Sequence, residues 1–207
     1  VLPEVIWADS GGGGTWMTEV QITDLTGGSL ISAYFNSIDG TRRGRITLWN
    51  NPGGEEASRK ITNILLWMYY LDPGYYYYNK VGALEFVTQD SAHKIQVSAR
   101  TKNGDYSKTF PGINLTYDNT AEVGRPLMVQ NLVSNSTYRS SAGLFNPTDD
   151  IVTVGIDLFD ASGANLGAPI FYALSPHAYK AFNPFDEAGV TGNHDNVWMK
   201  ILPNSGD

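Results

Sequence analysis

The sequence predicts an all-β protein of two tandem antiparallel β-sandwich domains, and three observations support this fold class. Short extended runs recur along the chain and are separated by turns rich in glycine and proline, which number 22 and 10. Apolar residues at helical spacing are scarce. A β-unit near the N-terminus also recurs in the second half of the chain, and this internal repeat indicates two similar domains rather than one large one.

The repeated unit is a strand, a turn and a second strand. Residues 15–26 match residues 137–148 in character at an offset of 122. The first strand of each copy alternates apolar and polar residues, and the even offset keeps Trp16 and Tyr138 on corresponding faces. Chance likeness between patterned β-sequences is the alternative explanation of the match. Two further matches keep their order: 59–65 with 179–185, and 82–86 with 196–200.

The first domain is expected over residues 1–115. Asp39-Gly40 and Asn103-Gly104 are hairpin signals that separate neighbouring strands. Residues 57–70 fit either a short helix, with Ile61, Ile64, Leu65 and Met68 on one face, or a strand followed by a loop. The expected strands lie at 5–8, 15–23, 30–35, 45–49, 81–88, 93–102 and 105–110.

A polar, turn-rich stretch at 111–124 is expected to link the domains, and the second domain is expected over residues 122–207. Its strands are predicted near 127–132, 152–158 and 169–173. The first copy continues into a strong strand at 94–100 that has no counterpart in the second. We therefore expect the second domain to lack its last strand within this chain. That strand would belong to a longer protein or be added by a partner at the open edge.

The second domain resembles immunoglobulin-like β-sandwich repeats of secreted bacterial surface proteins. The resemblance rests on the turn at 145–148, the alternating strand at 152–159, the Asp160–Gly163 hairpin and the closing run 181–184. It covers roughly residues 126–207 and, more loosely, 5–110. It implies an extracellular or cell-surface location. It transfers no functional residue, because such repeats have no common active site.

Composition excludes several classes of function. A net charge of −7 disfavours nucleic-acid binding, which needs a basic surface. No apolar run approaches the roughly 20 residues that span a bilayer. The absence of cysteine excludes disulfides and thiolate metal sites, and fits a cytosolic protein or a bacterial exported one. Val1–Glu4 has no signal-peptide features, so a signal peptide is assumed to have been removed.

A tyrosine-rich segment at 67–78 is the strongest candidate for a binding site, since it holds six of the twelve tyrosines. Asp72-Pro73-Gly74 forms a tight turn within it. Four consecutive tyrosines in a strand cannot all point inward, so we expect at least two of them to be exposed. Packing of alternate rings on the sandwich is the competing interpretation. The predicted ligand-binding residues are Trp67, Tyr69, Tyr70, Tyr75, Tyr76, Tyr77 and Tyr78.

Catalytic motifs are absent from the sequence. His93, His177 and His194 lack metal-ligand spacing, and the paired acidic residues lie in predicted loops. We therefore expect no catalytic residue, metal or cofactor. The sequence favours a non-enzymatic extracellular module for adhesion, glycan binding or protein binding. A structural spacer in a larger secreted protein is the alternative, and a hydrolase with a spatially assembled site ranks third.

Overall fold

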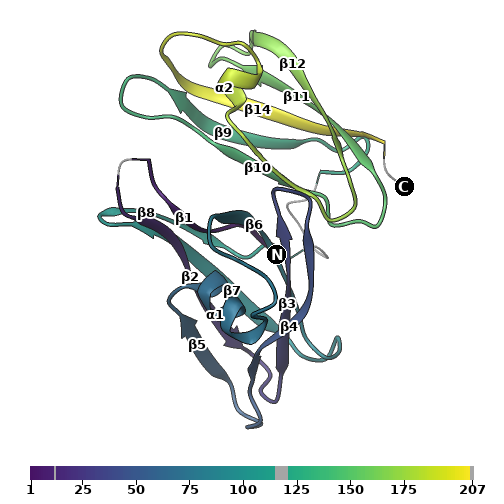
Figure 1. Ribbon diagram of the computed structural model, residues 1–207. Helices are drawn as coiled ribbons and strands as arrows, with labels where there is room; N and C mark the ends of the chain where they lie inside the picture. The colour runs from purple at the N-terminus through teal and green to yellow at the C-terminus, as the bar shows by residue number, and fades with distance from the viewer. Residues whose placement is uncertain (12, 115–120, 206–207) are drawn as a thin grey trace. The chain divides into compact units, whose positions relative to one another are not determined.

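The computed structural model describes residues 1–11, 13–114 and 121–205. Strands account for 56% of the chain and helices for 6%, and the sheets are antiparallel, so the all-β prediction is confirmed. The chain divides into two compact units, Val1–Asn114 and Leu115–Asp207. Figure 1 draws the chain as a ribbon. Each unit has a hydrophobic core of its own.

The described residues of the first unit form one eight-stranded antiparallel sheet and one helix. Its strands are hydrogen-bonded in the order β4-β3-β6-β1-β2-β7-β8, and β5 pairs with β2. The elements are β1 (Leu2–Asp9), β2 (Thr15–Asp24), β3 (Leu30–Ser37), β4 (Arg42–Asn50), β5 (Ala57–Ile61), α1 (Ile64–Leu71), β6 (Lys80–Val87), β7 (Ile95–Asn103) and β8 (Tyr106–Pro111).

Alternation of buried and more exposed residues along β2 shows that one face of this strand packs on the core. Thr18, Val20 and Ile22 are fully buried, whereas Gln21 on the opposite face is exposed. This agrees with the alternation predicted for the first copy of the repeat. The hairpin predicted at Asn103-Gly104 also forms, because Gly104 supplies the positive φ, +56°, that the turn between β7 and β8 requires.

The ambiguous segment 57–70 contains both structures that its pattern allowed. Residues up to Ile61 form β5, and the helix α1 begins after Asn63. The Asn63 side chain caps this helix by accepting the backbone N–H of Leu66 at 3.1 Å. The four apolar residues at helical spacing, Ile61, Ile64, Leu65 and Met68, are all buried in the first core.

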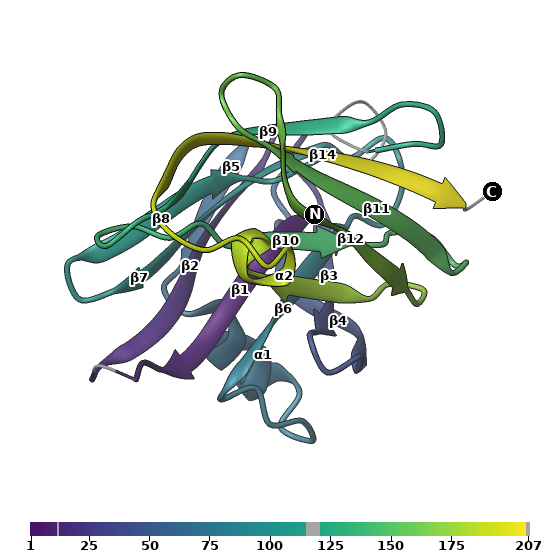
Figure 2. The ribbon, with the colours of Figure 1, turned by 90° about the horizontal axis from the view of Figure 1, so that it is seen from above.

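The described residues of the second unit, 121–205, form two sheets. Four strands are paired in the order β12-β11-β14-β9, and β10 pairs with β13; Figure 2 shows the larger sheet from above. The elements are β9 (Leu127–Ser134), β10 (Ala142–Phe145), β11 (Val152–Phe159), β12 (Asn165–Leu174), β13 (Tyr179–Phe182), α2 (Pro184–Glu187) and β14 (His194–Ser205).

Strand pairing follows the same order in both units. The first four strands of the sheet in the first unit, β4-β3-β6-β1, correspond in chain order to β12-β11-β14-β9. The pair β2 and β5 likewise corresponds to β10 and β13. A short helix with an asparagine N-cap follows the fifth strand of each unit, capped by Asn63 in one and Asn183 in the other.

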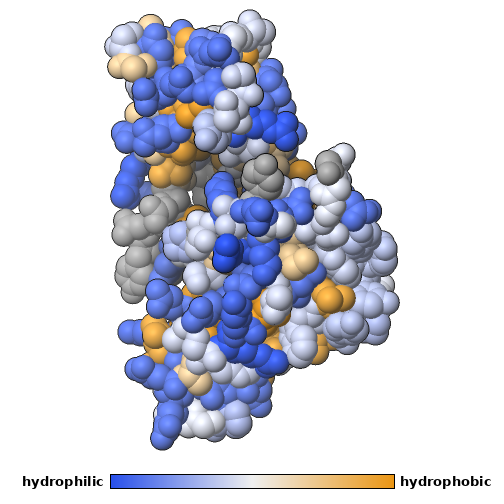
Figure 3. Space-filling view, turned by 90° about the vertical axis from the view of Figure 1, so that its left-hand side faces the viewer, coloured by the Kyte–Doolittle hydropathy of each residue, from blue (hydrophilic) through white to orange (hydrophobic). Residues whose placement is uncertain are grey.

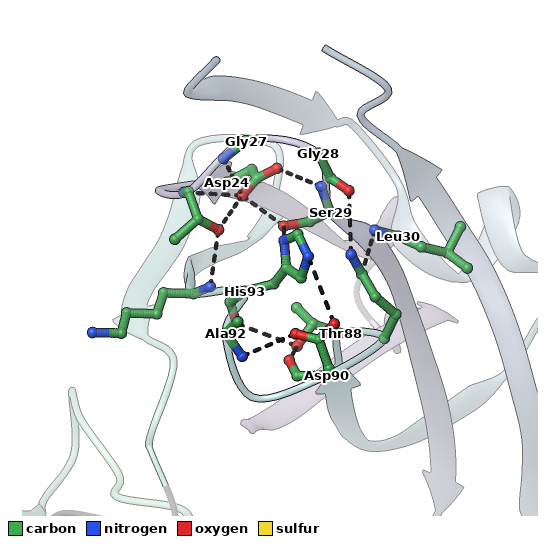
Figure 4. Close-up of polar contacts among 12 residues, drawn as sticks. Asp24, Gly27, Gly28, Ser29, Leu30, Thr88, Asp90, Ala92 and His93 are labelled. Atoms are coloured by element: carbon green, nitrogen blue, oxygen red, sulfur yellow. Dashed lines mark hydrogen bonds and ion pairs between the residues drawn. The ribbon is translucent and has the colours of Figure 1, made fainter. Parts of the chain in front are cut away.

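The turn after β2 is organised by Asp24, which is fully buried (Figure 4). Its carboxylate accepts the backbone N–H groups of Gly27 at 3.1 Å and Ser29 at 3.0 Å. It also accepts the Ser29 hydroxyl at 2.7 Å and the Asn51 side-chain amide at 2.9 Å. Burial alone would raise the pKa of Asp24. The hydrogen bonds from Ser29 and Asn51 outweigh burial and hold that pKa well below its ordinary value.

The turn after β10 has the same construction around Asn146, which lies 122 residues after Asp24 and is also buried. Asn146 accepts the backbone N–H and the hydroxyl of Thr148 at 3.0 and 2.8 Å. Thr26 makes the same two contacts to Asp24, each at 3.2 Å. The Asn146 amide donates to the carbonyl of Leu174, the last residue of β12, at 3.1 Å. In the first unit, Asp24 makes the corresponding contact with Asn51, which follows β4.

The predicted linker at 111–124 overlaps the end of the first unit, which was expected over residues 1–115. Pro111 is the last residue of β8, and Gly112 donates a backbone hydrogen bond of 2.7 Å to the carbonyl of Val97. Ile113 donates to the carbonyl of Val1, also at 2.7 Å. The start of the expected linker is therefore part of the first unit. Residues 115–120 of that linker lie outside the described residues.

Candidate functional site

The tyrosine-rich segment forms α1 and the turn that leads into β6. The helix packs against β1, β2 and β4 through its buried residues Ile64, Leu65 and Met68. It ends at Leu71, where the N–H of Asp72 donates to the carbonyl of Met68 at 2.8 Å. Tyr75 to Tyr78 follow in irregular structure rather than in a strand.

The structure divides the seven predicted binding residues into three groups. Tyr70 and Tyr76 are 67% and 64% exposed. Tyr77 is fully buried in the core. Trp67, Tyr69, Tyr75 and Tyr78 are partly buried. The expectation that at least two of the four consecutive tyrosines are exposed is therefore wrong, because the turn orients their rings irregularly and only Tyr76 is exposed.

Tyr75 and Tyr77 turn toward the core and stabilise the first unit. Their ring centroids lie 6.4 and 5.6 Å from that of Phe35, and 4.7 Å from each other. The Arg43 guanidinium lies over the Tyr75 ring at 4.8 Å and pairs with Asp72 at 2.6 Å. The Tyr77 hydroxyl donates to the same carboxylate at 3.4 Å. These two tyrosines are structural.

Tyr77 is expected to ionise only in strongly alkaline solution. Burial raises the pKa of Tyr77, and the negative charge of Asp72 raises it further. The folded state therefore favours the protonated phenol, and its stability falls once the pH rises through about 10, the pKa of an unfolded tyrosine. In a spectrophotometric titration of the folded protein, Tyr77→Phe should remove absorbance that appears well above pH 10. Loss of absorbance that the wild type already develops by about pH 10 would contradict this assignment.

Tyr76 and Tyr78 point to the other side of the turn, toward β1. The Tyr78 ring meets Trp7 edge-on at a centroid distance of 5.0 Å, and its hydroxyl donates to Asp9. This hydrogen bond raises the pKa of Tyr78. The Tyr76 ring lies 6.1 Å from that of Tyr78 and is otherwise exposed. Trp7, Tyr78 and Tyr76 thus form an aromatic series that runs from β1 to the surface.

An open groove of about 440 Å³ lies beside α1. Its lining comes from β2, from β5 and the segment that follows it, and from α1. The lining residues are Met17, Arg59, Lys60, Ile61, Thr62, Asn63, Leu66, Trp67 and Tyr70. The groove is of the size that small ligands occupy in proteins.

Trp67 is held firmly in the wall of this groove. Its indole N–H donates to the carbonyl of Leu48 at 3.4 Å, and the Arg59 guanidinium lies over its ring at 4.9 Å. Tyr70, one helical turn further on, leaves most of its ring in solvent. The groove therefore has one fixed aromatic side chain and one accessible ring.

The two basic residues that line the groove, Arg59 and Lys60, have different partners. Lys60 pairs with Glu19 at 2.9 Å, and Lys102 pairs with the same carboxylate at 3.5 Å. The hydrogen bond from Lys60 lowers the pKa of Glu19 despite partial burial. Arg59 forms no ion pair with any carboxylate in the described ranges and stacks on Trp67 instead. Arg59 also lines the groove, and its guanidinium carries only hydrogen-bond donors.

The register of β1 and β2 connects the groove to the aromatic series. Met17 lines the groove and lies directly opposite Trp7 in the antiparallel pair. Directly opposed residues share a face of the sheet and have Cβ atoms about 5 Å apart. Trp7 in turn contacts Tyr78, which precedes β6. On the face drawn in Figure 3, apolar residues form small patches among hydrophilic ones.

Of the residues that line the groove, the sequence predicted two as ligand-binding residues and did not indicate the others in that role. Trp67 and Tyr70 were predicted, and both line the groove. Met17, Arg59 and Asn63 were missed, because the pairing of β2 with β5 and the start of α1 bring them together. The missed signal was the asparagine just before an apolar helical run, which marks a helix N-terminus.

Ser29, His93 and Asp90 lie close together but do not form an accessible nucleophilic centre (Figure 4). The Ser29 hydroxyl lies 3.2 Å from His93 Nδ1, and His93 Nε2 lies 3.8 Å from Asp90. Ser29 is fully buried, however, and its hydroxyl donates a hydrogen bond to the Asp24 carboxylate. The three residues join the turn after β2 to the loop before β7.

Two further properties concern the whole described chain. Within those ranges, no three His, Asp or Glu side chains gather closely enough to hold a metal ion. No described helix has the length and apolar character that crossing a membrane requires. No protein-family model, curated protein or solved structure matches this chain.

Proposed function

We propose that the chain is a non-enzymatic extracellular module of a bacterial surface protein, and that its first unit binds carbohydrate in the groove beside α1. The groove carries the proposal, since it combines the exposed Tyr70 ring with the fixed Trp67 ring and the polar residues Arg59 and Asn63. An aromatic ring stacks on the apolar face of a sugar, while amide and guanidinium groups bind its hydroxyls.

We further propose that both units are copies of one immunoglobulin-like β-sandwich. Three corresponding features support this relation. The strands pair in the same order, as described above. Asp24 and Asn146 organise equivalent turns at an offset of 122 residues. Thr18 accepts the backbone N–H of Ile6 in β1 at 2.9 Å, and Ser140 accepts that of Val133 in β9 at 2.8 Å.

The buried position of Ser29 supports a non-enzymatic role. A nucleophile must reach its substrate, and the hydroxyl of Ser29 is covered and already donates to Asp24. The remaining histidines lie elsewhere: His177 contacts Asp149 at 2.9 Å, and His194 contacts the carbonyl of Thr191 at 3.0 Å. These positions support our proposal that the protein binds its ligand without a catalytic step.

The test is binding of the full chain to a panel of neutral and acidic polysaccharides by affinity electrophoresis. Tyr70→Ala should weaken binding about tenfold, because it removes the accessible stacking surface. Tyr138→Ala is the matched control: Tyr138 is 68% exposed in the second unit, against 67% for Tyr70, and its loss should leave binding unchanged.

Two results would contradict the carbohydrate site. The wild-type chain could bind no member of the panel, which would favour the structural-spacer function. Alternatively, Tyr138→Ala could weaken binding as much as Tyr70→Ala, which would place the ligand elsewhere or show that surface tyrosines bind it unspecifically.

A further inference from the structure

The strand β10 in the second unit is paired on one side only within the described ranges. Ala142–Phe145 pair antiparallel with Tyr179–Phe182, and no other described strand lies beside them. In an antiparallel pair, alternate residues direct their N–H and C=O groups away from the partner strand. The second edge of β10 therefore presents backbone donors and acceptors that can pair with a further strand.

The first unit shows a strand in the corresponding place. Residues 20–23 of β2 lie 122 positions before Ala142–Phe145 and are paired on both sides. β5 occupies one edge, as β13 does on β10. β7 occupies the other edge, where Val20 is opposite Ala99 and Ile22 is opposite Val97. The second unit has no described counterpart of β7.

Burial differs between the two strands as this comparison predicts. Val20 and Ile22 are fully buried between their neighbours. Ala142 and Leu144 occupy the corresponding positions and pack against the second core, yet both are only partly buried. The core of the second unit is thus incompletely covered beside β10.

The edge of β10 is short, four residues, but it carries none of the charges, prolines or bulges that protect other free edges. Proteins guard such edges with charged residues, proline or bulges. Ala142–Phe145 contain no charge and no proline, and the pairing of β10 with β13 has no register shift. The other edge strands contain Arg42, Arg43 and Arg45 in β4, Arg59 and Lys60 in β5, Lys108 and Pro111 in β8, Pro169 in β12, Lys180 in β13, and register shifts in β9.

We propose that the open edge of β10 accepts an extended peptide strand from a partner protein, in the place that β7 occupies on β2. Backbone hydrogen bonds supply affinity in such strand addition, and alternate side chains supply specificity. The pattern of β7 defines the chemistry of the partner strand. Small apolar residues such as Val97 and Ala99 face the core, and polar residues such as Gln96 and Ser98 alternate with them.

Disulfide trapping can locate this strand, because the chain contains no cysteine. The probe is a synthetic peptide of residues 94–102 in which Gln96 is replaced by cysteine. Thr23 is opposite Gln96 in the first unit, and Phe145 lies 122 residues after Thr23. Phe145→Cys in the full chain should therefore form a mixed disulfide with the probe in a redox buffer. The β2 edge of the same chain is already occupied by its own β7.

Phe171→Cys is the matched control. It makes the same replacement on β12, the edge strand of the larger sheet in the second unit. We expect at least tenfold more trapped peptide at Phe145→Cys than at Phe171→Cys, and no such preference with a scrambled peptide. Equal trapping at both positions, or equal trapping of the scrambled peptide, would overturn the proposal. A disulfide-linked dimer of Phe145→Cys without peptide would identify a second copy as the occupant and would also overturn it.

A second measurement does not depend on the cysteine variant. The unmodified peptide should slow hydrogen exchange of the backbone amides in Ala142–Phe145 of the wild-type chain, and unchanged exchange at saturating peptide would contradict the proposal. This inference is independent of the carbohydrate site. The Tyr70→Ala variant should still bind the peptide, so failure of one proposal is distinguishable from failure of the other.

Discussion

Replacing Asp24 by alanine is expected to lower the free energy of unfolding of the first unit by about 3–5 kcal/mol. The substitution leaves several buried donors without an acceptor: the N–H groups of Gly27 and Ser29, the Ser29 hydroxyl and the Asn51 amide. Denaturant unfolding followed by tryptophan fluorescence measures this loss selectively, because four of the five tryptophans lie in the first unit.

Asn146→Ala is the control that shows whether the loss of stability is confined to the unit that carries the substitution. It removes the corresponding side chain from the second unit and should leave the transition of the first unit unchanged. Acid provides a second check. The pKa of Asp24 is lower in the folded state than in the unfolded state, so its contribution is complete above about pH 5 and is lost as the pH falls. Asp24→Ala should remove this part of the acid sensitivity. Equal stability of wild type and Asp24→Ala at pH 7 would contradict the role given to this carboxylate.

Tyr77→Ala is expected to destabilise the first unit by about 3–5 kcal/mol, whereas Tyr76→Ala should change its stability by no more than about 0.5 kcal/mol. Tyr77 is fully buried against Phe35, and its removal leaves a cavity in the core. Tyr76 is the neighbouring residue, of the same type, and 64% exposed. Comparison of the two midpoints of unfolding in denaturant measures the difference. Similar losses in both variants would contradict the orientation of this segment.

The sequence predicted those parts of the fold that depend on local pattern. Alternation along 15–23 predicted β2, and the Asn103-Gly104 turn predicted the β7–β8 hairpin. The repeat alignment matched Asp24 with Asn146 although the residue types differ. Each side chain organises the turn that follows its own strand. Turn chemistry and period-two alternation act over a few residues, so a single sequence contains them.

The sequence could not predict features that depend on contacts between distant segments. The exposure of Tyr75 to Tyr78 was misjudged, because the backbone of a turn has no regular alternation. The groove depends on the register of β2 with β1 and β5, which brings Met17 and Arg59 beside α1. Trp67 and Tyr70 were identified because they belong to a segment with an unusually high content of tyrosine. Their neighbours in the groove are common residue types with no local signal.

An NMR titration of the isotopically labelled full chain with the tightest-binding polysaccharide fragment tests the carbohydrate site most directly. The groove predicts backbone shift changes concentrated in three segments that line it: Met17 with its neighbours, 59–63 and 66–70. These changes should disappear in Tyr70→Ala and persist in Tyr138→Ala. Shift changes concentrated in the second unit, or preserved in Tyr70→Ala, would contradict the assignment of the binding site to the groove beside α1.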